Sequence, residues 1–370
     1  MKNGKLQVAV IGCGGIANQK HLPALTAQAD KCEIVALCDI IEERAIKAQK
    51  DFAPNAKVYT DYNEVFKDEE IDVVHVCTPN VAHCPITVAA FEAGKHVLCE
   101  KPMAANTEDA QKMMDAWKKS GKKFTIGYQN RFRRDCLTLK KFCEEDGLGD
   151  VYFAKAHAIR RRAVPTWGVF PNKALQGGGP LIDIGTHALD ITLWMMDNYE
   201  VESVTGSVFE KLGHSELATQ GNMFGAWDPE TYEVEDSAFG YIKMKNGATI
   251  FLESAWAINM KESREAATTL CGTKAGAELV GGMSHGQEYQ LVINDTTCGQ
   301  LTEKTLSPGG TIAFFEGNGS GEPKDLECKQ WLEAIINDTE PLVKPEQAFV
   351  VTKILDNIYK SAREGHEIKF

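Results

Sequence analysis

The sequence predicts an α/β fold whose N-terminal part is a doubly wound parallel sheet with helices on both faces. Short, β-branched apolar runs bounded by polar or glycine residues predict strands at residues 6–11, 33–38, 73–77, 96–99 and 123–127. Helical periodicity lies between them, at residues 15–29, 41–52, 81–93 and 107–120, with Thr107 as the expected N-cap of the last helix. Strands that alternate with helices in this order require crossover connections, and hence a parallel sheet.

The pattern changes after residue 127, which we predict to be the end of the first domain. Residues 151–162 form a longer apolar run, and residues 238–244 and 248–256 flank Asn246-Gly247, a strong hairpin signal. Residues 128–370 are therefore predicted to be an α/β domain on a large, mainly antiparallel sheet covered on one side by helices. Residues 211–232 are polar and glycine-rich and predict a long loop. Residues 345–364 carry apolar residues at helical spacing and predict a helix that docks back.

Size and composition exclude several classes of protein. The 370 residues suggest two domains at about 100 to 200 residues each. The 40 Lys and Arg against 52 Asp and Glu give a formal charge of −12, which disfavours a nucleic-acid partner. No apolar run approaches the roughly 18 to 20 residues of a membrane span, and no signal peptide pattern precedes the first strand. The eleven cysteines lack any Cys-x-x-Cys pair, which favours free thiols and a cytoplasmic location.

A glycine-rich turn follows the first predicted strand. Gly12-Cys13-Gly14-Gly15-Ile16-Ala17 matches G-x-G-x-x-A between a strand and a helix. Gly12 permits the sharp turn, and Gly14 lets the backbone approach a pyrophosphate. Gly15 and Ile16 begin a helix whose free N–H groups attract phosphate. Cys13 is expected to fill the turn as a small residue, although its oxidation would offer a way to block the cofactor.

The second predicted strand ends at Asp39, the position from which an acidic side chain binds the adenosine ribose. Its charge would repel a 2′-phosphate, so NAD is favoured over NADP. Arg44, on the following helix, weakens that inference because it could reach a phosphate, although a solvated helix-face arginine is the commoner explanation.

The third predicted strand ends in Cys77-Thr78-Pro79-Asn80, with His83 one turn later. Ligands of open parallel sheets bind at the carboxyl ends of strands, so Thr78, Asn80 and His83 are expected to line the dinucleotide. For His83, the alternative is a hydrogen-bonded helix histidine with no contact to a ligand.

The fourth predicted strand delivers Glu100-Lys101-Pro102 to the same edge of the sheet. A lysine directly after a buried strand is costly unless it is used, and its ammonium can stabilise alkoxide character on a reacting hydroxyl. The alternative is a structural Lys–Glu pair.

A helix in the second domain carries three polar residues on an apolar background. After Gly177-Gly178-Gly179-Pro180, Asp183, His187 and Asp190 fall at i, i+4 and i+7 of one predicted buried helix. His187 is expected to take the proton of a substrate hydroxyl, and Asp183 to orient the substrate or the imidazole. Asp190 is expected to be structural. One histidine with carboxylates is a poor zinc ligand set, so no metal is predicted.

These motifs together resemble the Gfo/Idh/MocA oxidoreductase family along nearly the whole chain, as do Tyr-Gln-Asn-Arg-Phe at 128–132 and the segment 272–276. The resemblance implies a Rossmann domain and an α/β domain whose open sheet often serves in oligomerisation, as a dimer or tetramer. It implies that Lys101, Asp183 and His187 are catalytic, and that Glu100 and Asn130 lie near the cofactor. Family members act mostly on sugars, inositols and their derivatives with NAD or NADP.

Further substrate contacts are expected from Arg131 and from the run Arg160-Arg161-Arg162 with Trp167. Arg160 and Arg162 could clamp hydroxyls or an anionic group, and the indole could stack on a sugar. The alternative is a solvated strand end with one packed tryptophan.

The expected activity is hydride exchange between NAD and a secondary hydroxyl of a carbohydrate or polyol, such as C3 of a hexose or glycoside. A redox-assisted glycosidase or lyase, in which a transient oxidation is followed by elimination, remains an alternative. A non-catalytic NAD-sensing protein is disfavoured because all three catalytic-type residues are present.

Overall fold

The predicted parallel sheet is present in the computed structural model, which describes residues 1–282, 287–306 and 322–370. Within the described residues this sheet has six strands, and every neighbouring pair is parallel. The strands are β1 (Leu6–Ile11), β2 (Cys32–Cys38), β3 (Lys57–Tyr59), β4 (Val73–Val76), β5 (His96–Cys99) and β6 (Phe124–Ile126). Their order, β3-β2-β1-β4-β5-β6, reverses its direction between β1 and β4, which confirms a doubly wound sheet.

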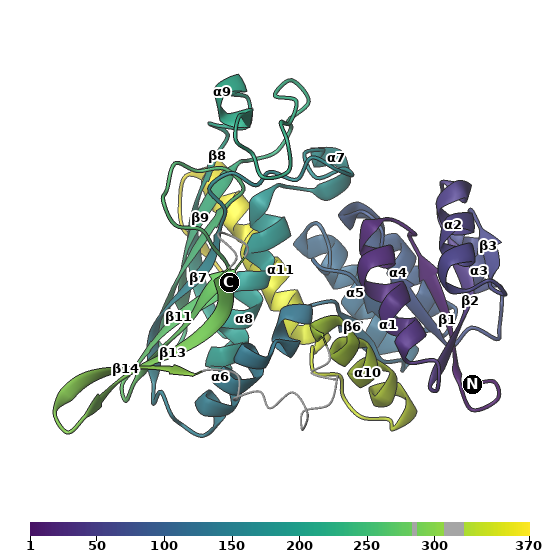
Figure 1. Ribbon diagram of the computed structural model, residues 1–370, viewed down its shortest axis with the longest axis horizontal. Helices are drawn as coiled ribbons and strands as arrows, with labels where there is room; N and C mark the ends of the chain where they lie inside the picture. The colour runs from purple at the N-terminus through teal and green to yellow at the C-terminus, as the bar shows by residue number, and fades with distance from the viewer. Residues whose placement is uncertain (283–286, 307–321) are drawn as a thin grey trace. The chain divides into compact units, whose positions relative to one another are not determined.

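Helices pack on this sheet in two groups (Figure 1). Contacts link α1 with α2 and α10, and link α4 with α5. The helical segments are η1 (Ala17–His21), α1 (Leu22–Ala27), α2 (Glu42–Phe52), α3 (Tyr62–Phe66), η2 (Asn80–Ala82), α4 (His83–Glu92), α5 (Thr107–Ser120), η3 (Gln129–Phe132) and α10 (Pro323–Ile336). Each of the four predicted helix starts has a helical segment that begins within two residues of it, because the crossover helices carry a strong apolar periodicity.

Three local features of this part of the chain differ from the prediction. The N-cap of α5 is Asn106, whose side chain accepts a hydrogen bond from the N–H of Asp109 at 2.8 Å, and Thr107 is instead the first helical residue. Asparagine and threonine are both good caps, and here the earlier residue takes the role. The strand β3 and the helix α3 were not predicted, because three and five residues are too few to show a period.

The chain divides into two units that do not follow the predicted boundary throughout. The first unit comprises residues 1–132 and 321–349, and the second comprises residues 133–320 and 350–370. The prediction placed all of 128–370 in the second domain. Segment 321–349 joins the first unit because Cys328, Trp331 and Leu332 of α10 belong to the same hydrophobic core as β1 and β2.

The second unit is built on a mainly antiparallel sheet, as predicted. Within the described residues it has nine strands in the order β14-β13-β12-β11-β7-β10-β9-β8-β15, and the β7–β10 pair is the parallel one. The strands are β7 (Val151–Ile159), β8 (Val201–Phe209), β9 (Ser237–Met244), β10 (Thr249–Ala255), β11 (Arg264–Gly272), β12 (Gly276–Gly282), β13 (Gln287–Thr297), β14 (Gln300–Leu306) and β15 (Ile368–Lys369).

Helices cover one face of this sheet, and aromatic side chains are exposed on it elsewhere. The helical segments are α6 (Arg134–Glu144), α7 (Lys173–Gln176), η4 (Leu181–Gly185), α8 (Thr186–Met196), α9 (Glu216–Thr219) and α11 (Pro345–Glu364), whose first residues lie in the first unit. Helix α8 packs on β7 and β11, and Ile358 of α11 packs against Gly206 and Gly240 (Figure 1). Phe251 and Tyr241 are each 42% exposed and stack edge to face.

Other predicted features of the second unit are present. Strands β9 and β10 form the hairpin around Asn246-Gly247, where Gly247 has a φ of +89°. The loop 211–232 contains only the short helix α9, and α11 has the predicted bounds. Strand β7 ends at Ile159, before the predicted end at 162, although an isolated bridge still pairs Arg162 with Ala257.

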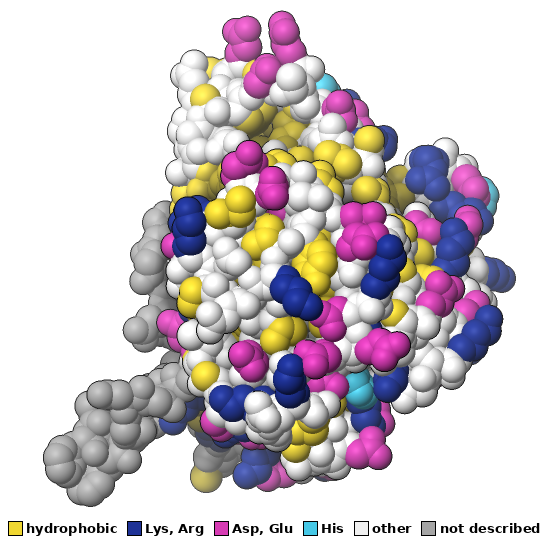
Figure 2. Space-filling view, turned by 90° about the vertical axis from the view of Figure 1, so that its right-hand side faces the viewer, with side chains coloured by type: hydrophobic (Ala, Val, Ile, Leu, Met, Phe, Trp, Pro, Cys, Tyr) yellow, Lys and Arg dark blue, Asp and Glu magenta, His cyan; other side chains and the backbone are white. Residues whose placement is uncertain are grey.

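Charged side chains of both signs are interspersed on the face of the molecule that Figure 2 shows. On this face the negative charges are therefore not gathered into one patch. Among the residues that the structure describes, none of the helices combines the length and the apolar character that crossing a membrane takes.

Candidate active site

The glycine-rich turn after β1 has the geometry of a phosphate cradle. Gly12 has a φ of +91°, and a Cβ atom there would lie 2.5 Å from the carbonyl oxygen of Cys77. This close approach brings the turn after β4 beside the turn after β1. At Gly14 and Gly15 a Cβ atom would meet nothing within 4 Å, so open space lies next to both residues. The turn therefore fits a bound pyrophosphate.

Asp39 and Asn18 hold this turn in place. The carboxylate of Asp39 accepts hydrogen bonds from the N–H of Cys13 at 2.8 Å and of Ile41 at 2.9 Å, one to each oxygen. The side-chain amide of Asn18 donates to the carbonyl oxygens of Cys13 and Gly14, both at 2.8 Å. Sequence reasoning missed Asn18, although an asparagine in the first turn of a helix often binds nearby backbone.

Asp39 keeps hydrogen-bonding capacity for a ribose. Each carboxylate oxygen has more lone-pair capacity than the one backbone N–H that it accepts, so Asp39 can also accept from ribose hydroxyls. Arg44 lies exposed on α2. Cys13 is buried, and burial first and the nearby Asp39 charge second raise the pKa of its thiol to about 12. A thiol with so high a pKa resists oxidation, which agrees with the expectation that Cys13 simply fills the turn.

His83 lies in the protein interior between two carbonyl oxygens, as the alternative of a hydrogen-bonded helix histidine describes. It is buried, and its Nδ1 lies 2.8 Å from the carbonyl oxygen of Pro102 while its Nε2 lies 3.0 Å from that of Thr78. Burial, the largest effect, lowers the pKa of His83, so the ring is neutral and donates through one nitrogen. His83 therefore lies between the turns after β4 and β5 and donates a hydrogen bond to one of the two carbonyl oxygens. Thr78 is half-buried at the turn, and Asn80 is buried at the start of η2.

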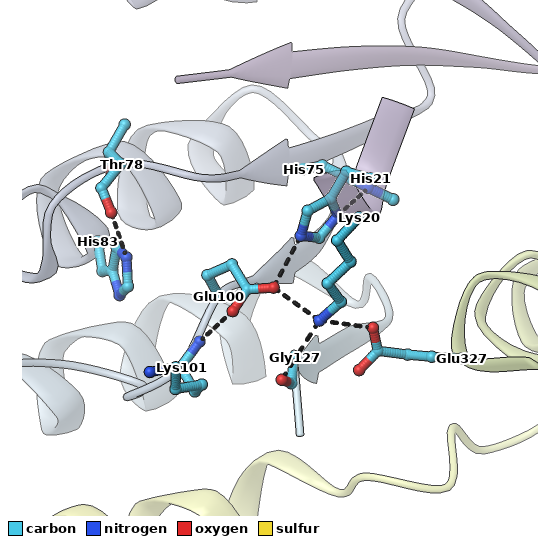
Figure 3. A network of polar contacts seen from close by, with 9 residues as sticks. All are labelled: Lys20, His21, His75, Thr78, His83, Glu100, Lys101, Gly127 and Glu327. Carbon is cyan, nitrogen blue, oxygen red and sulfur yellow. Dashed lines mark hydrogen bonds and ion pairs between the residues drawn. The ribbon is translucent and has the colours of Figure 1, made fainter. Parts of the chain in front are cut away.

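The Glu100-Lys101-Pro102 segment follows β5 directly (Figure 3). Glu100 is buried, and its Oε1 lies 2.7 Å from both Lys20 Nζ and His21 Nε2. Its Oε2 accepts the backbone N–H of Lys101 at 3.2 Å, and Lys101 itself is half-exposed. Glu100 is thus paired with Lys20.

Arg131 does not occupy a substrate-binding position. Its side chain is fully buried, and its guanidinium donates to Gln347 Oε1 at 2.7 Å and to the carbonyl oxygen of Leu342 at 3.4 Å. The arginine therefore anchors the segment 321–349 within the first unit. The prediction was wrong because the partner residues are more than 200 positions away in sequence. Asn130 is half-buried in η3.

In the second unit, Asp183 and His187 are the polar side chains that the predicted buried helix leaves accessible. Within residues 181–195, all of which the structure describes, these two are half-exposed and every other residue is buried. Residues Leu181–Gly185 form a π-helical turn before α8 begins at Thr186. Such turns recur at functional sites. Here Asp183 lies within the π-helical turn and His187 lies in the α-helix that follows, so their spacing differs from that of a regular α-helix. Asp190 is buried, as its expected structural role requires.

Two residues that sequence reasoning missed hold this helix start. Trp256 Nε1 donates a hydrogen bond to Asp183 Oδ2 at 3.0 Å. The buried carboxylate of Glu235 accepts from the N–H groups of Gly179 at 2.8 Å and Leu181 at 3.1 Å, and from the hydroxyl of Tyr359 at 2.7 Å. Burial raises the pKa of Glu235. The sequence offered one signal for Glu235, namely the acidic pair Glu235-Asp236 directly before β9.

The arginine run after β7 is mostly engaged by the protein itself. Arg160 binds Glu265 through two contacts of 2.7 and 2.5 Å and donates to the carbonyl oxygen of Ala163, so it is a structural clamp. Arg162 donates to Asn259 at 2.5 Å. Arg160, Arg161 and Arg162 all line a cavity of about 660 Å³.

Trp167 is 51% exposed and belongs to an aromatic row that ends beside Asp183. Its ring lies 4.7 Å from that of Phe224 and 5.9 Å from that of Phe170, which in turn lies 6.2 Å from the ring of Trp256. Because Trp256 binds Asp183, this row connects the exposed indole with the half-exposed carboxylate.

Comparison with protein families matches both units. A family model described as an oxidoreductase family with an NAD-binding Rossmann fold covers residues 6–128, and its C-terminal alpha/beta domain covers residues 140–370. The chain belongs to the Gfo/Idh/MocA oxidoreductase family. This confirms the family resemblance, the Rossmann and α/β architecture, the oxidoreductase class and NAD as the cofactor of this Gfo/Idh/MocA protein.

Individual relatives of this Gfo/Idh/MocA oxidoreductase include characterised dehydrogenases. It is 35% identical to D-glucoside 3-dehydrogenase of Escherichia coli K12, over 100% of this chain and 99% of that one. It is 30% identical to inositol 2-dehydrogenase of Salmonella typhimurium, over 52% of this chain and 55% of that one. The crystal structure of aldose-aldose oxidoreductase from Caulobacter crescentus with glycerol is similar at a TM-score of 0.79 and 25% identity, over 99% of this chain and 100% of that chain.

Proposed function

We propose that this Gfo/Idh/MocA oxidoreductase oxidises a secondary hydroxyl of a sugar or glycoside, such as C3 of a D-glucoside, with NAD. The observation that carries the proposal is the exposure of Asp183 and His187 alone along an otherwise buried helix, residues 181–195. An acid–base pair that stays accessible on an apolar helix suits proton transfer with a bound hydroxyl. The full-length similarity to D-glucoside 3-dehydrogenase supports a glucoside as the substrate class.

Each residue has a distinct role in this reaction. His187 accepts the hydroxyl proton as the carbon–hydrogen bond breaks, and Asp183 orients the imidazole or the substrate. Lys101 is suited to donate a hydrogen bond from its ammonium to a reacting hydroxyl oxygen and to stabilise the negative charge that develops there. When bound, NAD takes up the hydride. The hydroxyl-bearing carbon thus loses a hydride and its oxygen loses a proton, and a ketone remains.

Residues of the first unit suit the cofactor. Gly14, Gly15 and Ile16 would hold the pyrophosphate through the N–H groups of the turn and the helix start. Gly12, whose own N–H donates to the carbonyl oxygen of Cys38 at 2.8 Å, permits the turn. Asp39 would accept hydrogen bonds from the ribose, and its charge opposes a 2′-phosphate. Thr78, Asn80 and Asn130 stay candidates for contacts with the rest of the dinucleotide. Glu100 would act through Lys101, and Arg44 is an exposed residue of α2.

Trp167 and Arg162 suit the sugar. The exposed indole of Trp167 offers an apolar ring face to the C–H groups of a pyranose. Arg162 contributes donors to the cavity that it lines with Arg161 and Asn259. We leave Arg160 and Arg131 out of the substrate contacts because Glu265 and Gln347 bind their guanidinium groups.

Incubation with NAD and a panel of glucosides, free hexoses, inositols and sugar acids tests the proposal. Accumulation of NADH with one new keto group, located by NMR after reduction with borodeuteride, is the expected result. Release of the aglycone without net NADH would favour the redox-assisted glycosidase instead. Tight NAD binding with no turnover of any panel member would favour a sensor.

We also propose a cytoplasmic homo-oligomer. All eleven cysteines are free, which suits a reducing compartment. The edge-to-face cluster of Phe153, Tyr241 and Phe251 on the second sheet exposes apolar area that a second copy would cover. Light scattering of the purified protein, with Phe251→Ser as the comparison, tests this: a wild-type monomer would contradict it.

A further inference from the structure

A cluster of buried titratable side chains lies beneath the turn that carries Lys101 (Figure 3). It comprises Lys20 and His21 of η1, His75 of β4, Glu100 after β5 and Glu327 of α10. Lys20 Nζ lies 2.7 Å from Glu100 Oε1, 2.8 Å from Glu327 Oε2 and 3.4 Å from the carbonyl oxygen of Gly127. One lysine therefore joins four segments of the first unit.

The two histidines can be assigned a proton each. His21 Nε2 lies 2.7 Å from Glu100 Oε1, so this nitrogen carries a proton and donates to the carboxylate. His21 Nδ1 lies 3.0 Å from His75 Nδ1. Burial lowers the pKa of both rings, so His21 is neutral and its Nδ1 accepts a hydrogen bond from a protonated His75 Nδ1. The two neutral histidines thus form a chain of hydrogen bonds in which His75 donates to His21 and His21 donates to Glu100.

The charge of the cluster is carried by Lys20 and the two glutamates. Burial alone would raise the pKa of Glu100, but the charge of Lys20 and the hydrogen bond from His21 hold it well below its usual range. Glu100 is therefore an anion that Lys20 neutralises. Burial, the largest effect, raises the pKa of Glu327 to about 7, and the charge of Glu100 adds to the rise while Lys20 opposes it.

The surrounding backbone is shaped to admit this cluster. A Cβ atom at Gly127 would lie 2.8 Å from Glu100 Oε1 and 3.1 Å from Lys20 Nζ. A side chain at this position, directly after β6, would therefore require the Glu100 carboxylate to shift.

The cluster reaches Lys101 through the second oxygen of Glu100. Oε1 is held by Lys20 and His21, and Oε2 accepts the backbone N–H of Lys101 at 3.2 Å. The backbone of Glu100 is itself fixed, because its N–H donates to the carbonyl oxygen of Val76 at 2.9 Å. The orientation of the carboxylate therefore decides where the Lys101 backbone lies.

Buried ion pairs seldom stabilise a fold more than apolar residues of the same volume would. A role in geometry explains this cluster better than a role in stability. We propose that Lys20 and Glu327 are positioning residues that fix the Glu100 carboxylate and, through it, the backbone from which the Lys101 ammonium reaches the reacting hydroxyl. The proposal rests on the catalytic role of Lys101 proposed above.

Four variants of the full chain test this proposal, assayed with NAD and methyl glucopyranoside carrying hydrogen or deuterium at C3. Lys20→Met and Glu327→Leu remove the two contacts, and we expect kcat to fall at least about tenfold because a small misplacement of a catalytic group is costly. The KM for NAD should stay within about threefold of wild type. Glu327→Gln keeps an oxygen for Lys20 and should retain kcat. Lys57→Met removes an ion pair with Asp68 on the surface of the same unit and should change nothing.

The isotope effect separates positioning from a general loss of structure. If Lys101 is misplaced, the hydride step slows and the primary isotope effect on kcat increases in Lys20→Met and Glu327→Leu. A purely structural role would lower the fraction of active enzyme and leave the isotope effect unchanged, and that result would overturn the proposal. Full kcat in both folded variants would overturn it equally.

Two further variants keep the outcome decisive. Should Lys20→Met fail to fold, Gly127→Ala displaces the same carboxylate without removing a charge and should give the same fall in kcat and rise in isotope effect. Lys101→Met separates the two proposals. If it stays fully active, the proposed function of Lys101 fails, whereas an inactive Lys101→Met beside normal Lys20 and Glu327 variants refutes the positioning role alone.

Discussion

Trp256 Nε1 donates a hydrogen bond to Asp183 Oδ2 at 3.0 Å, and this contact fixes the carboxylate at the start of the helix that bears His187. We expect Trp256→Phe to lower kcat about tenfold, the effect of losing one hydrogen bond to a charged group of about 1.5 kcal/mol. NAD affinity, measured by the fluorescence of bound NADH, should not change. Weakened NADH binding together with unchanged kcat would contradict the assignment.

Trp331 offers a matched control for that substitution. It is as deeply buried as Trp256, but its Nε1 has no hydrogen-bond partner among the described residues. Trp331→Phe therefore removes an indole N–H that makes no contact, and kcat should stay at the wild-type value. An equal loss in both variants would point to the volume of the ring rather than to the hydrogen bond with Asp183.

Lys101→Met should lower kcat by about 10² or more, as expected when a group that stabilises charge on the reacting oxygen is lost. The dissociation constant of NAD should remain close to that of wild type. A parallel loss of NAD affinity in calorimetry would identify Lys101 as a nucleotide ligand instead. A double-mutant cycle with His187→Ala would then measure how strongly the two residues act together.

Glu327 makes stability depend on pH in an unusual direction for a carboxyl group. Its pKa is about 7 in the folded protein, above the ordinary value of 4.5, so the folded state holds a proton that the unfolded state releases between these values. The free energy of unfolding should therefore fall as pH rises from about 4.5 to about 7, by on the order of 3 kcal/mol from this group. In Glu327→Gln this position has no titratable group, so this contribution to the pH dependence of stability should be absent.

Urea unfolding of both proteins at pH 5 and pH 8 measures this effect. Other groups titrate in both proteins and cancel in the difference. Wild type should lose stability relative to Glu327→Gln on going from pH 5 to pH 8. A constant difference between the two proteins would show that Glu327 titrates in its ordinary range.

Asp39→Ala should shift the cofactor preference from NAD towards NADP. The substitution removes the ribose acceptor and the charge that repels a 2′-phosphate, and it also releases the N–H groups of Cys13 and Ile41. We expect kcat/KM for NAD to fall about 10- to 100-fold, and that for NADP to fall less. Asp39→Asn, which keeps an acceptor for one N–H, separates the loss of charge from the loosening of the turn. An unchanged ratio between cofactors would refute the role of Asp39.

The sequence was sufficient for features that depend on local patterns. The strands β1 and β5 and the helices α5 and α11 have the predicted bounds, because their apolar periods are long or sharply bounded. The turn at Gly12 was predictable because a strand, a glycine string and a helix occur in succession. The accessible pair of Asp183 and His187 was predictable because polar residues contrast with an apolar helix.

Features that depend on distant partners were not predictable. Arg131 and Arg160 look like ligand-binding arginines in the sequence, and only the fold supplies Gln347 and Glu265 to bind them. Lys20 falls in an ordinary helical pattern, and its role depends on Glu327, far along the chain. The π-helical turn at Leu181–Gly185 has no sequence period of its own.

The return of α10 to the first unit bears on the order of events during synthesis. Trp331 and Leu332 complete a core that begins with β1, so the nucleotide-binding unit is still missing part of its interior when residue 132 leaves the ribosome. Lys20 then has Glu100 as a partner but lacks Glu327. The first unit can therefore finish folding only after strands β7 to β14 of the second unit have been translated, and a nascent chain lacking α10 should remain sensitive to protease even with NAD present.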